Sequence, residues 1–343
     1  MRKVFAIDLE GQITLDDNAF GLTKNKIDEG DKLFSQISKY DDCSHVIKKP
    51  IQSGNTLKLI LPFLVAYGVS DENMIEYSSQ NITLFPEAKN VLKSVRIPEY
   101  IVTTSYRHYV RPVCEQIDFP FERVYCTKFN INDYVISEKE KQDIRKLKEE
   151  IVGMPMIEIP KKVESLEDFS ERDKRTINRL DEIFEEVIPR MSAGRILEEV
   201  KIMGSYEKAR AVKDIVERKN TKLENVMFTG DSITDCGALR LVRENGGLAV
   251  SFNGNEYAIN EASIAVLSRN TYPLLALADE FESGNKNVFK FIHYWNKIHG
   301  KSNISPRVLP KIEIITDENR ERLAKESSVF RKYVRGEAIG RLG

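Results

Sequence analysis

Short apolar runs alternate with amphipathic stretches along much of the chain, and this pattern predicts strands that are followed by helices. Several runs are rich in β-branched residues, as expected for buried strands. The predicted strands cover residues 3–8, 99–105, 123–129, 225–231, 248–253 and 263–268. Because strand–helix–strand alternation favours parallel pairing, the sequence predicts an α/β fold with a Rossmann-like parallel sheet and helices on both faces.

Two long segments interrupt this alternation with helical patterns. Residues 15–83 are mainly helical in pattern, and the apolar stretch at 57–69 predicts a buried helix. Residues 136–199 are dense in charge, so we interpret them as a helical insertion, with coiled or paired helices as the simplest reading. One helical face of this segment is apolar and consists of Ile177, Leu180, Ile183, Phe184 and Val187.

The remaining segments define a predicted core and a C-terminal extension. The core consists of residues 1–14, 84–135 and 200–285. It includes a helix after the second strand that we expect Pro112 to interrupt. The extension, residues 286–343, contains a helical pattern at 288–298, a candidate strand at 311–316 and a charged helix at its end.

Composition narrows the classes of partner. The 52 Lys+Arg nearly balance the 53 Asp+Glu, so the chain lacks the basic bias of nucleic-acid binders, and we expect no nucleic-acid partner. The lysine pairs at 48–49 and 161–162 read as solvated surface. No apolar run approaches the roughly 20 residues that span a bilayer, and the first residues do not resemble a signal peptide. We therefore expect no direct membrane insertion.

The cysteines indicate a reducing compartment. Cys43, Cys114, Cys126 and Cys236 show no CxxC spacing, and in a chain of 343 residues they read as reduced thiols. We therefore predict a cytoplasmic protein.

Polar side chains follow three of the predicted strands at their carboxyl ends. Asp8 and Glu10 follow the first strand, hydroxyl residues at 103–105 end the second, and Asp231 and Asp235 follow the fourth. A single acid after a strand is most often a helix cap or a turn former. Because the carboxyl ends of parallel strands share one sheet edge, the three sets together predict a ligand site there.

The residue types at this edge suit phosphoryl transfer with a divalent cation. Carboxylates that share a crevice repel one another, and Mg²⁺ with oxygen ligands removes the repulsion. Asp8 is placed to be both a metal ligand and a nucleophile, and Gly11 would let the backbone turn closely around a phosphate. Lys208, near the start of a predicted helix, is the candidate cation for the phosphate, with a surface lysine as the alternative.

The order of these residues along the chain resembles the haloacid dehalogenase superfamily. The resemblance covers residues 3–14, 84–130 and 200–267, and the sequence GDSITD at 230–235 is its strongest part. Within the superfamily the chain is most similar to the phosphoserine-phosphatase branch. Over its whole length it resembles an archaeal predicted-hydrolase family that includes proteins named energy-converting hydrogenase A subunit R, which suggests an archaeal source.

The resemblance implies a role for each of these residues. Asp8 would be the nucleophile and Glu10 the general acid and base. The phosphate would be held by Gly11, Lys208 and Thr103, with Thr104 as the alternative hydroxyl one residue along. The ligands of Mg²⁺ would be Asp8, the backbone carbonyl of Glu10, Asp231 and Asp235. Residues 15–83 would form a helical cap over the site, and residues 136–199 occupy the position of a second cap.

Three positions depart from the commonest pattern of the superfamily, of which Gln12, in place of the usual Thr, matters little. Glu10 stands where Asp is usual, although a glutamate can still move a proton to a leaving oxygen. Thr234 stands where phosphoserine phosphatases often carry Asn, which weakens any transfer of phosphoserine as the substrate.

The sequence therefore predicts a Mg²⁺-dependent phosphomonoester hydrolase that acts on a small phosphorylated metabolite. A phosphotransferase with the same chemistry is one alternative. An accessory or regulatory subunit of a hydrogenase-type complex is the other, docked through the charged helices at 136–203 and the C-terminal tail. Carbon–halogen or phosphonate cleavage is disfavoured because the acid at position 10 suits protonation of an ester oxygen. Whether the chain forms a homo-oligomer or docks to a larger complex stays open.

Overall fold

The computed structural model describes residues 2–47, 53–160, 163–299, 308–340 and 342. The lysine pairs at 48–49 and 161–162 lie outside the described residues. Within the described part of the chain, no helix is both long and apolar enough to cross a bilayer. All four cysteines are buried and free of disulfides.

A seven-stranded sheet forms the centre of the molecule, in the order β3-β2-β1-β4-β5-β6-β7. Six strands are parallel and β7 pairs antiparallel with β6, so the predicted α/β fold with a parallel sheet is confirmed. The strands are β1 Val4–Ile7, β2 Glu99–Tyr106, β3 Val124–Thr127, β4 Val226–Gly230, β5 Leu248–Phe252, β6 Ile264–Leu267 and β7 Lys311–Ile314.

Helices cover both faces of this sheet, as the alternation of side chains along β1 shows. Val4 and Ala6 pack on one face against α11 Ser205–Arg218, α12 Cys236–Glu244 and α13 Glu256–Glu261. Phe5 and Ile7 pack on the other face. The helices of this second face are α6 Ala88–Ser94, α7 Arg107–Ile117, α14 Tyr272–Ser283 and α15 Asn285–His299. Burial on both faces is why the strands read as continuous apolar runs.

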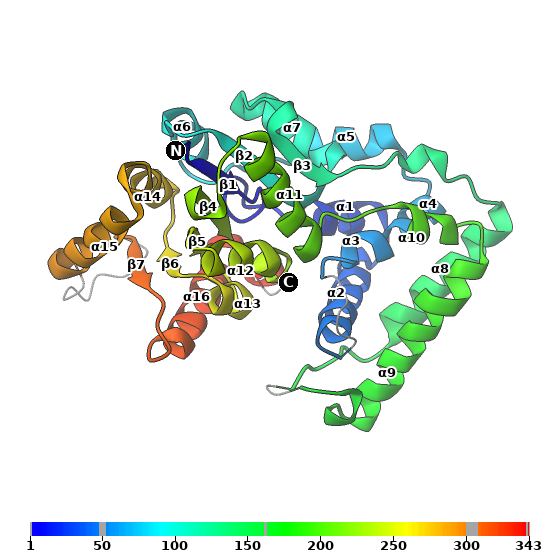
Figure 1. Ribbon diagram of the computed structural model, residues 1–343. Coiled ribbons are helices and arrows are strands. Elements are labelled where there is room, and N and C mark those ends of the chain that lie inside the picture. The colour runs from blue at the N-terminus through cyan, green and yellow to red at the C-terminus, as the bar shows by residue number, and fades with distance from the viewer. Residues whose placement is uncertain (1, 48–52, 161–162, 300–307, 341, 343) are drawn as a thin grey trace.

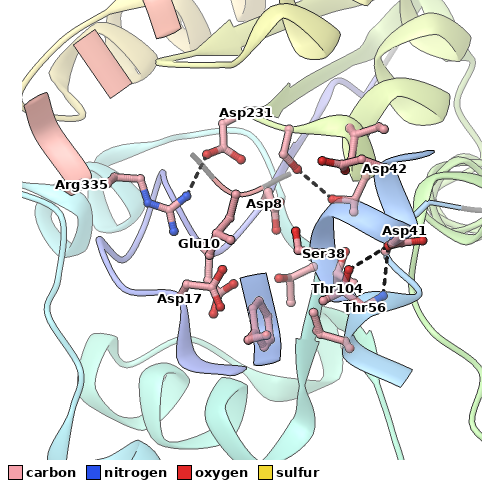
Figure 2. Close-up of a pocket in the computed structure, with 18 of the residues that line it drawn as sticks. Asp8, Glu10, Asp17, Ser38, Asp41, Asp42, Thr56, Thr104, Asp231 and Arg335 are labelled. Atoms are coloured by element: carbon pink, nitrogen blue, oxygen red, sulfur yellow. Dashed lines mark hydrogen bonds and ion pairs between the residues drawn. The ribbon is translucent and has the colours of Figure 1, made fainter. Parts of the chain in front are cut away.

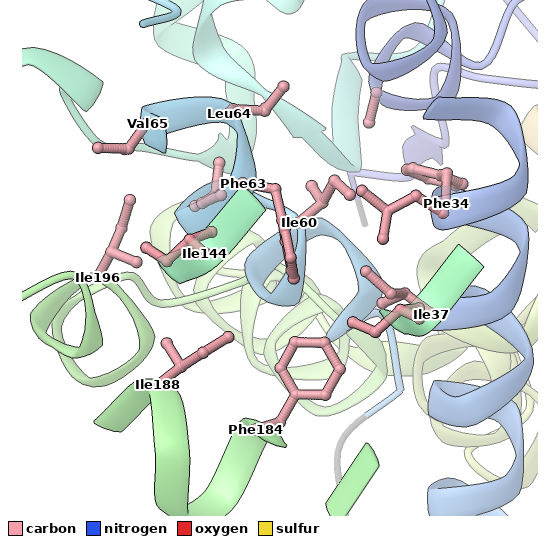
Figure 3. Packing of buried hydrophobic residues seen from close by; sticks show 14 of the residues in the cluster. Phe34, Ile37, Ile60, Phe63, Leu64, Val65, Ile144, Phe184, Ile188 and Ile196 are labelled. Atoms are coloured by element: carbon pink, nitrogen blue, oxygen red, sulfur yellow. The ribbon is translucent and has the colours of Figure 1, made fainter. Parts of the chain in front are cut away.

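The two helical insertions share one hydrophobic cluster beside the sheet (Figure 3). Phe34 and Ile37 from the first insertion pack in it with Ile144 and Phe184 from the second. The first insertion contributes α1 Asn18–Lys26, α2 Gly30–Ile47, α3 Thr56–Leu59, α4 Leu61–Ala66 and α5 Asp71–Gln80. The second contributes α8 Glu138–Gly153, α9 Glu171–Asp181 and α10 Gly194–Glu199. The division into domains stays a prediction, but the insertions are not independently packed.

The C-terminal extension returns to the sheet. After β7, helix α16 Arg320–Arg335 packs through Leu323, Ala324 and Phe330 against α13 and β6, and a short α17 Glu337–Gly340 follows it. In Figure 1, α16 lies beside α13. The charged helix expected at the end of the chain therefore packs against the central sheet and its helices.

Two helix predictions needed correction. Pro112 does not interrupt α7, because packing of its buried residues Val110, Val113 and Ile117 outweighs the loss of one backbone hydrogen bond. The helix expected at 57–69 is split into α3 and α4, with Pro62 in the first turn of α4, where a missing N–H is tolerated.

Candidate active site

The loops that follow β1, β2 and β4 meet at the point where the strand order reverses, which is where open α/β sheets bind ligands. A pocket opens there between the sheet edge, helix α2 and helix α16 (Figure 2). The predicted site residues that line it are Asp8, Glu10, Thr103, Thr104 and Asp231.

Lys208 lies at the centre of the predicted constellation. Its side chain is fully buried on α11, and its ammonium group donates to Asp8 Oδ2 at 2.7 Å, Asp235 Oδ1 at 2.8 Å and Thr234 Oγ1 at 3.2 Å. Burial alone would lower the pKa of Lys208, but Asp235 and Asp8 raise it by more, so the amine stays protonated. The surface-lysine alternative is therefore wrong.

Asp8 is fixed by the strand pairing and by its own loop. Its backbone N–H donates to the Thr229 carbonyl at 3.1 Å, so the residue still follows the register between β1 and β4. Its Oδ1 accepts from the Leu9 backbone N–H at 2.7 Å. The carboxylate is thus held between an amide and the Lys208 ammonium group, with its orientation set before any ligand binds.

Asp235 fixes the loop after β4 as well as contacting Lys208. Its Oδ2 accepts from the backbone N–H groups of Asp231 at 2.9 Å and Ser232 at 3.1 Å. The bond from Ser232 is one half of a capping box at the turn before α12, and the Asp235 backbone N–H completes it by donating to the Ser232 side chain. Asp235 therefore orders the loop that presents Asp231 to the pocket.

Glu10 is partly buried and lies beside a second acid, Asp17. Its Oε1 accepts from the Asn18 backbone N–H at 2.9 Å, at the start of α1. Burial raises the pKa of Glu10 well above its usual range, and the negative charge of Asp17 adds to the rise. A carboxyl group that holds its proton at higher pH can donate it as a general acid.

The residues expected to bind phosphate differ in what they already contact. The Thr104 hydroxyl donates to the Met203 carbonyl at 2.9 Å, whereas the Thr103 hydroxyl pairs with the Ser105 hydroxyl at 3.0 Å. The register of β2 shifts between Val102 and Tyr106, and such a bulge re-aims side chains. Of the two threonines, Thr103 is the one whose hydroxyl hydrogen is not committed to a backbone carbonyl.

Gly11 adopts a φ of +83°, which favours glycine. A Cβ at this position would lie 2.1 Å from Asp231 Oδ2. The glycine therefore permits close approach of Asp231, while its backbone N–H donates to the Thr14 carbonyl at 2.7 Å within the same turn.

Sequence reasoning missed two groups that line the pocket. Arg331 and Arg335 enter it from α16, although a charged C-terminal helix reads as solvated surface. Helix α2 contributes Phe34, Ser38 and Asp41 at spacings of four and three residues, which place them on one helical face. That spacing is the sequence feature from which the α2 residues could have been predicted to line a pocket. No local feature of the sequence distinguishes the two arginines from surface residues.

The donor set fits a hard divalent cation. Asp8, Asp231 and Asp235 each offer a buried carboxylate oxygen, and these atoms lie within 4.8 Å of one another. Magnesium binds through one or two carboxylates with water completing its shell. Three buried acids opposed by Lys208 and the α16 arginines are compatible with one such ion.

The chain is similar to known proteins both in sequence and in fold. A family model described as haloacid dehalogenase-like hydrolase matches residues 44–272. No curated protein matches the chain. The structure of gene product AF1437 from Archaeoglobus fulgidus is similar over 100% of this chain and 99% of its own, with 24% identity and a TM-score of 0.82, which shows a shared fold. A phosphoserine phosphatase in its apo form covers 80% of this chain, with 10% identity and a TM-score of 0.48.

Proposed function

The chain belongs to the haloacid dehalogenase-like hydrolase family, and we propose that it is a Mg²⁺-dependent phosphomonoesterase that acts through a phosphorylated Asp8. The observation that carries the proposal is the fully buried Lys208 ammonium group, which contacts both Asp8 and Asp235. Burial of a lysine between two carboxylates carries a desolvation cost, and this arrangement suits a site that must hold an anion beside a nucleophilic carboxylate.

In this mechanism a carboxylate oxygen of Asp8 attacks phosphorus while the bond to the leaving oxygen breaks. Glu10 gives its proton to that oxygen, and the alcohol departs. Glu10 then takes a proton from water, whose oxygen attacks the aspartyl phosphate and releases inorganic phosphate with Asp8 restored. The raised pKa of Glu10 supports its first role, because the carboxyl group must enter the cycle protonated.

The other residues hold the reacting groups. Lys208 would balance the charge of the phosphoryl oxygens, and the Thr103 hydroxyl would donate to them. The Gly11 backbone N–H, which the sequence offered as a further donor, already donates to the Thr14 carbonyl at 2.7 Å. The cation would be held by Asp8, Asp231, Asp235 and the backbone carbonyl of Glu10, and when bound it supplies charge neutralisation for the phosphate. The acidic and hydroxyl side chains on α2 face the same pocket, so this helical insertion is the proposed cap that contacts the leaving group.

Hydrolysis of p-nitrophenyl phosphate with Mg²⁺ tests the proposal. Asp8→Asn is expected to lose at least about a thousandfold in kcat because it removes the nucleophile, with its circular dichroism spectrum unchanged. Asp214→Asn is the matched control, since this carboxylate lies on α11 with Lys208 but contacts Arg218 and Tyr125 away from the pocket. Equal activity of Asp8→Asn and the wild type would overturn the mechanism.

Analysis of the products distinguishes a phosphotransferase from a hydrolase. A competing alcohol in the same assay would appear as a new phosphate ester if the aspartyl phosphate is transferred, and phosphate alone would be released if water is the acceptor. Inactivity across a panel of phosphate esters, together with a co-purifying partner, would instead favour the accessory-subunit alternative.

A further inference from the structure

Two arginines of the C-terminal helix converge on one carboxylate of the pocket. Arg331 and Arg335 lie one turn apart on α16 and both donate to Asp231 Oδ2, Arg335 from Nη1 at 3.2 Å. Arg331 Nη1 also donates to the Asp231 carbonyl at 3.3 Å. Their side chains are only 3% and 4% exposed. Figure 2 shows Arg335 pointing at Asp231, with Glu10 and Asp8 beside them.

The arginines are held in place by several elements and are not mobile surface residues. Arg335 also donates to the carbonyls of Leu15 at 3.1 Å and Asp16 at 2.6 Å, which lie in the loop after β1. One turn before Arg331, the buried Ser327 hydroxyl donates to the Gly254 carbonyl at 2.5 Å. Helix α16 thus ties together the loops that follow β1, β4 and β5.

The contact also depends on the turn after β1. A Cβ on Gly11 would lie 3.2 Å from Arg335 Nη1 as well as 2.1 Å from Asp231 Oδ2. The absence of a side chain there leaves room for the guanidinium group to meet the carboxylate. The arginine–aspartate contact is therefore accommodated by the same loop that carries Asp8 and Glu10.

We propose that Arg331 and Arg335 are positioning residues that set the affinity of the site for its divalent cation. This inference rests on the proposed function, because it takes Asp231 as a metal ligand. The guanidinium groups hold Asp231 in place while the site is free of metal, and their positive charges oppose a cation that binds the same carboxylate. Without α16, the carboxylates of Asp8, Asp231 and Asp235 would attract the cation more strongly, with Lys208 opposing it.

Two effects of removing an arginine have opposite signs. Loss of an orienting partner weakens metal binding, whereas loss of a positive charge strengthens it. In Arg335→Gln the second effect prevails, because Arg331 still holds Asp231 Oδ2. We expect Mg²⁺ to bind this variant about tenfold more tightly than the wild type.

Isothermal titration calorimetry with Mg²⁺ on the full chain tests this without reference to catalysis. Arg335→Lys keeps the positive charge, and Arg331 still holds Asp231, so this variant is expected to bind Mg²⁺ within about twofold of the wild type. Arg322→Gln is the matched control, because it removes a guanidinium group of α16 that pairs with Glu313 and Glu326 on the surface. Its affinity is expected to equal that of the wild type.

Equal or weaker binding of Mg²⁺ by Arg335→Gln would overturn the inference, while the phosphatase activity of the wild type would still stand. No binding to the wild type would overturn both the inference and the proposed metal site.

A second measurement, amide hydrogen exchange, needs no variant. Because coupling is reciprocal, Mg²⁺ should loosen the hold on α16 and reduce protection from amide hydrogen exchange at 331–335. Unchanged or greater protection would contradict the proposal.

Discussion

Replacement of Lys208 by methionine isolates the ion pairs at the centre of the site. Methionine is unbranched and also fits a buried slot, so the change removes the ammonium group with little change in packing. Asp8 and Asp235, at 2.7 Å and 2.8 Å from the ammonium nitrogen, then lose their shared cation inside the protein.

The expected cost is large because both carboxylates are buried. Removal of one partner from a buried ion pair typically lowers the free energy of unfolding by about 3–5 kcal/mol. Burial raises the pKa of Asp235 to about 7 even with Lys208 beside it, and loss of the ammonium group would raise it further. The deficit relative to the wild type should therefore be largest above about pH 7 and shrink as the pH falls toward 7, because protonation of Asp235 removes its unpaired charge. Activity toward p-nitrophenyl phosphate should fall by at least about a hundredfold, since the phosphate loses its cation.

Urea denaturation followed by circular dichroism, in the presence of EDTA, measures the stability change. Lys148→Met is the control, because Lys148 is also 0% exposed. Its partners Glu149 and Glu29 are 66% and 38% exposed, so they regain water when the lysine is lost. This variant should lose at most about 1 kcal/mol.

An equal loss in the free energy of unfolding in the two lysine variants would refute this reasoning. Burial of the lysine itself, and not burial of its carboxylate partners, would then determine the loss. A Lys208→Met deficit that stays constant as the pH falls from about 9 to about 7 would refute it as well. In a double-mutant cycle, Asp235→Asn should restore part of the stability lost in Lys208→Met.

Three further predictions address the surroundings of the site. Gly11→Ala should lower the free energy of unfolding by at least about 2 kcal/mol, because of its φ of +83° and the approach of Asp231, and an unchanged thermal midpoint would contradict this. Tyr40→Phe removes the 2.6 Å bond to Asp181 that joins α2 to α9, and urea denaturation should show a loss of about 1 kcal/mol rather than none. Burial raises the pKa of Asp42 to about 6, so ionisation between about pH 4 and 6 destabilises the folded state. Asp42→Asn should be more stable near neutral pH by up to about 2–3 kcal/mol, and identical stability profiles across that pH range would disprove the cause.

The fold and the catalytic side of the site could be predicted from sequence because their signals are local. Each parallel strand is a short apolar run. The end of that run marks the residues that follow the strand, and these lie at the carboxyl edge of the sheet. Asp8 and Asp231 were found in this way, and the sheet order then brought the ends of β1 and β4 together. Lys208 could be predicted as a site residue only from the order of the motifs along the chain, because nothing in the local sequence distinguishes a buried lysine from an exposed one.

The predictions of a helix break at Pro112 and of an unbroken helix at 57–69 were both wrong, because each relied on local sequence alone. Local propensity suggested a break at one proline and none at the other, but packing against the rest of the protein decided both outcomes. The shared cluster of the two insertions was equally hidden, since Phe34 and Phe184 come from segments that look separately amphipathic.

The sequence by itself determined the parallel sheet and the acids at its edge, because spacing along a strand controls both. Only the tertiary structure decided that α16 closes the pocket. Arg331 and Arg335 lie more than 300 residues after Asp8, and their helix has the charge pattern of a solvated surface. Their burial follows from contacts with Asp231 and with backbone carbonyls of distant loops. Such contacts depend on how the chain returns to the sheet, which no local pattern records.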